Sequence, residues 1–68
     1  MIFSERFKEL RLISGLTQTD VAEILDVSCG IISLWENGLR EPTARNILKA
    51  AEFFGVTCDY LLGASDKP

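Results

Sequence analysis

The sequence predicts an all-α protein, a compact bundle of five short helices around a central helix-turn-helix. Apolar residues recur at intervals of three and four along most of the chain, which is the period of a helix with one buried face. Cap residues and glycine stops also follow one another at helix-length intervals. The caps are Thr17, Ser28, Thr43 and Thr57, and the stops are Gly15, Gly38, Gly55 and Gly63.

The first helix is expected from about residue 4 to residue 14, with Gly15 ending it. Four apolar residues at three- and four-residue intervals predict its buried face, namely Phe3, Phe7, Leu10 and Ile13. We expect these side chains in the core of the protein.

The stretch from Leu16 to Gly38 predicts two short helices joined by about three residues. Thr17 followed by Asp20 indicates a helix start, because both side chains can accept hydrogen bonds from free backbone amides. Ser28 supplies a second cap after a break at Asp26, which tolerates the left-handed conformation expected there. Apolar residues continue the helical spacing through both helices, at Val21, Ala22, Leu25, Ile32 and Trp35. This is the layout of a helix-turn-helix at about residues 17–37.

The last third of the chain predicts C-terminal helices within residues 43–62. Thr43 caps a fourth helix that runs to about Phe54, and Thr57 caps a last short helix over residues 58–62. The inner face of the fourth helix is expected to hold Ile47, Leu48, Ala51 and Phe54. Residues 63–68 are a polar tail. We expect residues 1–68 to form a single helix-turn-helix domain.

Composition is that of a small globular protein. The chain has 68 residues, of which 47% are apolar and 25% charged, and this excludes a disordered tail or a coiled coil. No run has the length of a membrane span, and the N-terminus lacks the apolar core of a signal peptide, so we expect a cytoplasmic protein with no membrane partner. Seven Lys and Arg against ten Asp and Glu give a net charge of −3, which argues weakly against binding nucleic acid.

Residue types that carry chemistry are scarce. The chain has no His, no glycine-rich phosphate loop and no nucleophile with a matching base, so we expect no enzyme and no small-molecule substrate. Cys29 and Cys58 are far apart in sequence and lack metal-ligand spacing. We therefore expect two reduced thiols, no metal and no cofactor.

Several short stretches of the chain closely resemble the single-domain repressors of lambdoid phages and the wider Cro/C1-type helix-turn-helix family. They are Leu16-Thr17-Gln18, Val21-Ala22, Val27-Ser28, Ile32-Ser33, Trp35-Glu36-Asn37-Gly38 and Glu41-Pro42. The resemblance extends from about residue 7 to residue 63. It implies a lambda-repressor-like bundle of five helices that binds double-stranded operator DNA, usually as a dimer.

The resemblance also implies roles for individual residues. Arg11 is expected to pair with Glu36 and to lie near the DNA backbone, while Gln18 and Asn37 match positions that contact phosphate. The alternatives are a solvated residue at Gln18 and a turn residue at Asn37. Two further arginines, Arg40 and Arg45, lie beside the expected backbone path and suit phosphate geometry, although each could equally be a solvated surface residue.

The third helix is expected to enter the major groove, and its match to the family is the weakest. With Ile32 and Trp35 facing the core, the outward residues are Cys29, Gly30, Ser33 and Leu34, with Ile31 at the edge. None of these can make a bidentate contact with a base. Recognition of the base sequence must then depend on Ser33, on apolar contacts with thymine methyl groups or on DNA shape. Base specificity should therefore be low. The alternative is that this apolar face binds a protein.

Apolar residues at the C-terminal end exceed what a one-turn helix can bury, which predicts a homodimer. Candidate interface residues are Phe53, Tyr60 and Leu62. The sequence as a whole predicts a dimeric DNA-binding transcriptional regulator, a repressor of phage or bacterial type. The alternative is a helix-turn-helix module used for protein contact, such as a regulatory or antitoxin-like subunit.

Overall fold

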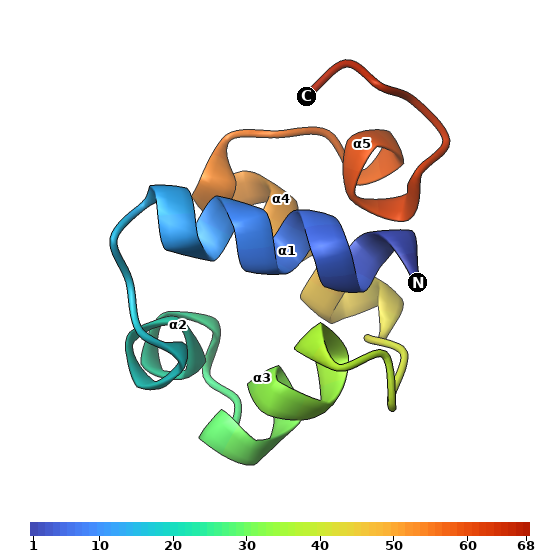
Figure 1. Cartoon of the computed structure of the whole chain (residues 1–68). Helices are drawn as coiled ribbons and strands as arrows, with labels where there is room; N and C mark the ends of the chain where they lie inside the picture. The colour runs from blue at the N-terminus through green and yellow to red at the C-terminus, as the bar shows by residue number, and fades with distance from the viewer.

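Five helices and no strand make up the structure, a computed structural model that describes residues 1–68. In chain order they are α1 (Ile2–Ile13), α2 (Gln18–Leu25), α3 (Cys29–Glu36), α4 (Ala44–Phe54) and α5 (Cys58–Leu62). The predicted all-α class and the five helices are confirmed. Figure 1 shows α1 lying across α4, with α5 and both chain ends on one side and α2 and α3 below. None of the five helices is both long and apolar enough to cross a membrane.

The helix ends follow the predicted caps closely. Thr17 Oγ1 accepts a hydrogen bond from the Asp20 N–H at 3.0 Å, and Asp20 Oδ2 accepts one from the Thr17 N–H at 2.9 Å. Asp26 ends α2 with φ 57° and ψ 49°, the left-handed conformation expected of it. Ser28 Oγ then accepts from the Ile31 N–H at 3.2 Å and starts α3. These local bonds define the turn between α2 and α3.

The core is apolar and rich in aromatic rings. Trp35 is 1% exposed and meets the rings of Phe3 and Phe7 edge to face, at centroid distances of 6.1 and 5.7 Å. Phe7 is fully buried and also meets Phe54 edge to face at 5.7 Å. Edge-to-face pairs stabilise a core by roughly 0.5–1.5 kcal/mol each beyond the burial of area. Trp35 therefore fastens α3 to α1, as its spacing predicts.

Two apolar residues expected in the core lie at the surface. Ile13 is 74% exposed and Leu48 is 53% exposed. Each residue adds about 100° around a helix, so a single three-residue step can carry a side chain off the stripe. On α1 the buried stripe continues from Phe7 to Arg11 and leaves Ile13 aside. On α4 the fully buried side chain is Ala50, and Leu48 lies beyond the edge of the face.

The end of the chain is held against α1 by Arg6. The Arg6 guanidinium donates to the Tyr60 carbonyl, to the Ser65 carbonyl at 2.7 Å and to Asp66 Oδ1 at 3.0 Å. It also lies 4.2 Å from the centroid of the Tyr60 ring. Next to it, Gly63 adopts φ +82°, and α5 lies beside the first turn of α1 (Figure 1). The predicted polar tail is thus part of the folded domain.

A substitution at Gly63 tests this packing. An added Cβ would lie 2.8 Å from Ile2 Cδ1, whereas at Gly55, which also has positive φ, a Cβ would meet nothing within 4 Å. Gly55→Ala should cost about 1–2 kcal/mol of unfolding free energy through backbone strain alone. Gly63→Ala should cost about 1–3 kcal/mol more, because the new methyl group also overpacks Ile2. Urea denaturation of both variants checks this, and equal losses would contradict the close packing of α5 on α1.

Candidate nucleic-acid interface

The residues of α3 that were expected to face outward are exposed to different degrees. Ile32 is fully buried and Trp35 nearly so, and these two residues fix the rotation of the helix. Cys29 and Gly30, at its first turn, are exposed. Ile31, Ser33 and Leu34 are half-buried, and Ile31 also packs against the core. The exposed start of α3 is therefore small and apolar.

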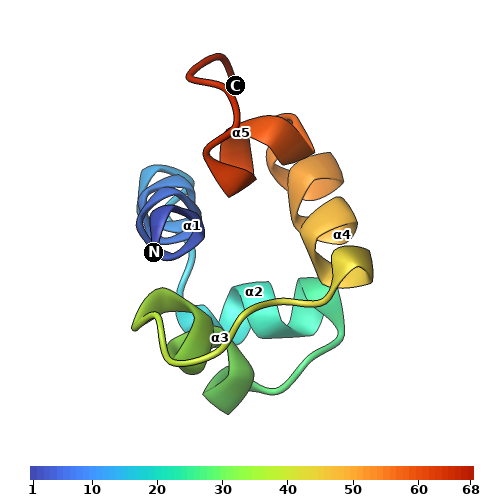
Figure 2. The same ribbon diagram turned by 90° about the vertical axis from the view of Figure 1, so that its right-hand side faces the viewer.

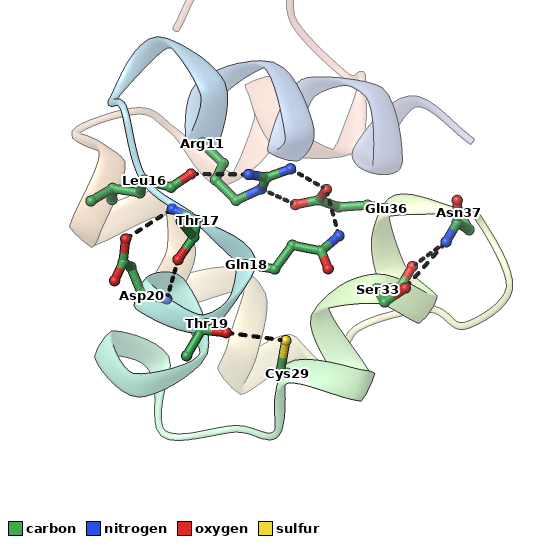
Figure 3. Close-up of polar contacts among 10 residues, drawn as sticks. All are labelled: Arg11, Leu16, Thr17, Gln18, Thr19, Asp20, Cys29, Ser33, Glu36 and Asn37. Atoms are coloured by element: carbon green, nitrogen blue, oxygen red, sulfur yellow. Dashed lines mark hydrogen bonds and ion pairs between the residues drawn. The ribbon is translucent and has the colours of Figure 1, made fainter.

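A buried ion pair lies between α1 and the C-terminal end of α3 (Figure 3). Arg11 Nε donates to Glu36 Oε2 at 2.7 Å, and Arg11 Nη2 donates to Glu36 Oε1 at 2.9 Å. The Arg11 side chain is 10% exposed and that of Glu36 is 2% exposed. Two parallel hydrogen bonds of this kind fix both the distance and the orientation of the two groups. The predicted pairing of Arg11 with Glu36 is confirmed.

The same ion pair reaches two further segments. Arg11 Nη1 donates to the Leu16 carbonyl at 2.9 Å, just before α2 begins. Gln18 Nε2, in the first turn of α2, donates to Glu36 Oε1 at 3.2 Å. Glu36 therefore orients the Gln18 amide. One network thus joins α1, the start of α2 and the end of α3 (Figure 3).

Hydrogen bonding to Glu36 dominates the titration of Arg11. It raises the pKa of Arg11 above its usual value, with the charge of Glu36 adding to the effect and burial opposing it. Arg11 therefore keeps its positive charge near neutral pH.

Two more contacts tie predicted site residues to their neighbours. Asn37 Nδ2 donates to the Ser33 carbonyl at 2.9 Å and contacts Ser33 Oγ at 3.3 Å. Thr19 Oγ1 lies 3.6 Å from Cys29 Sγ, so the first turns of α2 and α3 meet at their exposed ends. Ser33 and Asn37 are therefore hydrogen-bonded to each other at the surface of α3. Thr19 is an exposed residue of this region that the sequence analysis did not identify.

The two candidate phosphate-binding arginines have no ion-pair partner. Arg40 and Arg45 are both exposed. Arg40 borders a pocket of about 250 Å³ between α3 and α4, whose lining also includes Ile31, Thr43 and Asn46. Their guanidinium groups are therefore free to bind an anion.

The remaining cations have structural roles that the sequence did not indicate. Lys49 donates to the Leu25 carbonyl at 2.9 Å and so binds the C-terminal end of α2. Arg6 binds the chain end, as described above. Apart from Asp66, the acceptors are backbone carbonyls, which every residue carries, so no sequence pattern marks them.

The two cysteines are free thiols, Cys29 exposed and Cys58 half-buried. No group of three or more His, Cys, Asp or Glu side chains comes together in a way that could hold a metal ion.

Removing the buried carboxylate of Glu36 tests the hydrogen-bond network that joins α1, α2 and α3. Glu36→Ala should lower the free energy of unfolding by about 1–3 kcal/mol, because Arg11 would keep its charge without its main acceptor. Thermal denaturation measures the loss, and Glu41→Ala, at an exposed glutamate without an ion pair, is the control. A midpoint unchanged by Glu36→Ala would show that the pair does not stabilise the fold.

The cap of α2 predicts a dependence on acid. The backbone N–H of Thr17, and then its side chain, lower the pKa of Asp20 by hydrogen bonding to the ionised carboxylate. This stabilisation is present above the unfolded pKa of about 3.9 and is lost as pH falls through the lower folded pKa. Asp20→Asn should therefore flatten the fall in urea midpoint with acid, whereas Glu23→Gln on the same helix should not. Identical pH profiles for Asp20→Asn and the unmodified protein would contradict this.

Comparison with known proteins shows which family this chain resembles. The helix-turn-helix family model matches residues 7–61. The HTH-type transcriptional regulator ImmR of Bacillus subtilis (strain 168) is 35% identical over 66 residues, which are 97% of this chain and 52% of ImmR. The HTH-type transcriptional activator BcrR of Enterococcus faecalis is 39% identical over 66 residues, 97% of this chain and 32% of BcrR. The chain thus spans about half, or less, of the length of these curated relatives.

Solved structures of similar fold cover nearly the whole chain. The P22 c2 repressor, crystallised in complex with synthetic operator 9T, has a TM-score of 0.88 and 28% identity, covering 96% of this chain and 98% of that chain. The restriction-modification controller protein C.AhdI from Aeromonas hydrophila has a TM-score of 0.79 and 30% identity, covering 87% of this chain and 89% of that chain. With the family model matching most of the sequence and the fold agreeing, this chain belongs to the Cro/C1-type helix-turn-helix family.

Proposed function

We propose that this protein is a transcriptional regulator that binds double-stranded operator DNA as a homodimer, with α3 in the major groove. The observation that supports this most strongly is the similarity to the P22 c2 repressor, whose structure contains operator DNA and whose fold matches 96% of this chain. We expect the protein to act in the cytoplasm without catalytic activity. Its relatives include an activator as well as a repressor, so we leave the direction of regulation open.

Contacts to the DNA backbone would come from several elements around α3. Gln18 lies at the start of α2, where free backbone amides favour a phosphate, and Glu36 holds its side chain in place. Asn37, Arg40 and Arg45 would add contacts from the C-terminal end of α3 and the segment that follows it. Arg11 is 8% exposed and already bound to Glu36, so its part is to hold the network, with little surface left for phosphate. These contacts would fix the register of α3 without reading sequence.

Base reading would rest on few groups. Cys29 and Gly30 are exposed at the start of α3 and cannot make bidentate hydrogen bonds to a base. Ser33 shares its hydroxyl with Asn37, while Ile31 and Leu34 can meet thymine methyl groups only through their exposed edges. Each bidentate contact provides about 1–3 kcal/mol of discrimination, so its absence predicts low base specificity.

The number of free cations predicts a shallow dependence on salt. Of seven Lys and Arg, Lys8, Arg40, Arg45 and Lys67 have no ion-pair or hydrogen-bond partner for their side chains, and of these Arg40 and Arg45 follow α3 most closely in the chain. The slope of log K against log salt should then be no steeper than about −2 per protomer, at about 0.9 per phosphate contact. Arg40→Ala or Arg45→Ala should each reduce it by about one such step on every duplex tested, whereas Lys67→Ala should leave it unchanged. Titration at several salt concentrations checks this, and slopes unaffected by both arginine variants would exclude these contacts.

Shortening one side chain on α3 distinguishes an effect on DNA sequence preference from an effect on affinity. Leu34→Ala should change which duplexes are selected from a random pool more than it changes affinity for an average duplex, since Leu34 can contact thymine methyl groups but no phosphate. The comparison is selection with the unmodified and the variant protein. The same selected sequences from both would show that Leu34 does not read DNA.

A second function is favoured by one observation, the lack of Lys, Arg, Asn and Gln on α3 before Asn37. Exposed apolar surface commonly marks a protein interface. In this alternative the start of α3, at Cys29 and Gly30, with the edges of Ile31 and Leu34, would bind a protein partner. Absence of binding to any duplex at low salt would favour the alternative over DNA binding.

The homodimer remains a proposal, with Phe53, Tyr60 and Leu62 as its candidate residues from the sequence. Phe53 is 41% exposed and Leu62 is 52% exposed. Tyr60 is half-buried beneath Arg6, which reduces the area it can offer to a partner. Leu62 and Phe53 lie on different helices, α5 and α4, and can be tested separately.

A further inference from the structure

A small pocket lies between the α2–α3 turn, α3 and the start of α4, with a volume of about 250 Å³. We call it the α3–α4 pocket. Its apolar wall consists of Val27, Ile31 and Trp35, and its polar rim consists of Arg40, Glu41, Thr43 and Asn46. Figure 2 shows the connection that carries part of this rim, running from α3 across to the start of α4.

The apolar wall is part of the folded core. Val27 and Ile31 are half-buried and pack against the core cluster, and Trp35 is 1% exposed and belongs to it. These side chains are therefore in place before a ligand arrives. A preformed wall loses little conformational entropy on binding, and an apolar wall with a few polar groups is the usual composition of a small-molecule site.

The rim carries one charge of each sign. Arg40 and Glu41 are adjacent in the chain and exposed, and they form no ion pair with each other or with another residue. Thr43 caps α4 by accepting a hydrogen bond from the Asn46 N–H at 3.2 Å, so the positive end of the α4 dipole borders the pocket as well. A complementary ligand has a carboxylate and an ammonium group close together, next to an apolar part.

The volume of the pocket limits the size of this ligand. Water occupies about 30 Å³ per molecule in the liquid, so a space of about 250 Å³ corresponds to about eight water molecules. A ligand with about as many non-hydrogen atoms would fill it. Free α-amino acids with an aliphatic side chain, such as leucine, have this size, whereas a nucleotide is too large.

We propose that the α3–α4 pocket binds a free α-amino acid with an aliphatic side chain of about the size of leucine. Arg40 binds the carboxylate, Glu41 binds the ammonium group, and the aliphatic side chain lies against Val27 and Ile31. Because the bound amino acid engages Arg40, it competes with the DNA backbone for this residue. The competition rests on the proposed function, whereas the binding site itself does not.

Four small molecules test the site in the absence of DNA. Trp35 is the only tryptophan of the chain, so its fluorescence reports on the pocket. L-Leucine should bind with a Kd on the order of 1 mM. Isocaproate, which lacks the ammonium group, and isoamylamine, which lacks the carboxylate, should each bind about fivefold more weakly. Glycine, which lacks the apolar side chain, should not change the fluorescence at the same concentrations.

Two variants assign each charged group of the ligand to its partner. Arg40→Gln and Glu41→Gln should each weaken leucine binding about fivefold. Arg40→Gln should not alter the binding of isoamylamine, and Glu41→Gln should not alter that of isocaproate, because the matching ligand group is missing.

Matched controls remove the same charges elsewhere. Lys8→Gln and Glu52→Gln change exposed residues outside the pocket and should leave leucine binding unchanged. Equal thermal midpoints for all four variants show that each of them is folded.

A DNA titration tests the competition. Leucine at ten times its Kd should weaken DNA binding by the unmodified protein up to about tenfold, and it should have no effect on Arg40→Gln. DNA affinity that leucine does not change would overturn the competition.

Three results without DNA would overturn the binding site. They are fluorescence unchanged by leucine at ten times the expected Kd, equal binding of leucine, isocaproate and isoamylamine, and equal effects of Arg40→Gln and the Lys8→Gln control. Failure to bind any duplex would contradict the proposed function alone, because leucine binding is measured without DNA.

Discussion

The ion pair between Arg11 and Glu36 is the contact on which the candidate interface depends. It is buried, bidentate and shared by three parts of the chain, since Arg11 also binds the Leu16 carbonyl and Glu36 also binds Gln18. A buried pair of this kind adds little net stability but makes any other arrangement costly, because either charge alone would be unpaired. It therefore fixes the angle between α2 and α3, while Trp35 provides the apolar attachment to α1.

The acidity of the protein has a physical explanation in how the cations are used. Arg6, Arg11 and Lys49 each bind a carbonyl or a carboxylate inside the domain and contribute little to the outer field. Arg40 and Arg45 are exposed and have no ion-pair partner. A DNA-binding surface built in this way would rely on backbone amides, hydroxyl groups and shape more than on charge, which agrees with a net charge of −3.

Local chemistry explains which parts of the structure were predictable. The caps at Thr17 and Ser28 and the left-handed turn at Asp26 depend on residues within three positions, so the sequence indicated them directly. The partner of Arg11 lies 25 residues away and was predicted only through the family resemblance. Contacts of Arg6 and Lys49 with backbone carbonyls have no sequence signature. Ile13 and Leu48 were misplaced because apolar spacing alone does not show where a buried stripe ends.

Binding of duplex DNA to the α2–α3 surface can be observed directly by NMR, in a titration of isotope-labelled protein. Duplexes selected from a random pool would be added at low salt, and the amide signals of every residue followed. We expect shifts concentrated at the starts of α2 and α3, from Thr17 to Thr19 and from Cys29 to Ser33, and near Arg40 and Arg45. The exposed face of α1 around Lys8 should be unchanged. Signals that do not move, or that move mainly on α1 and α5, would contradict it.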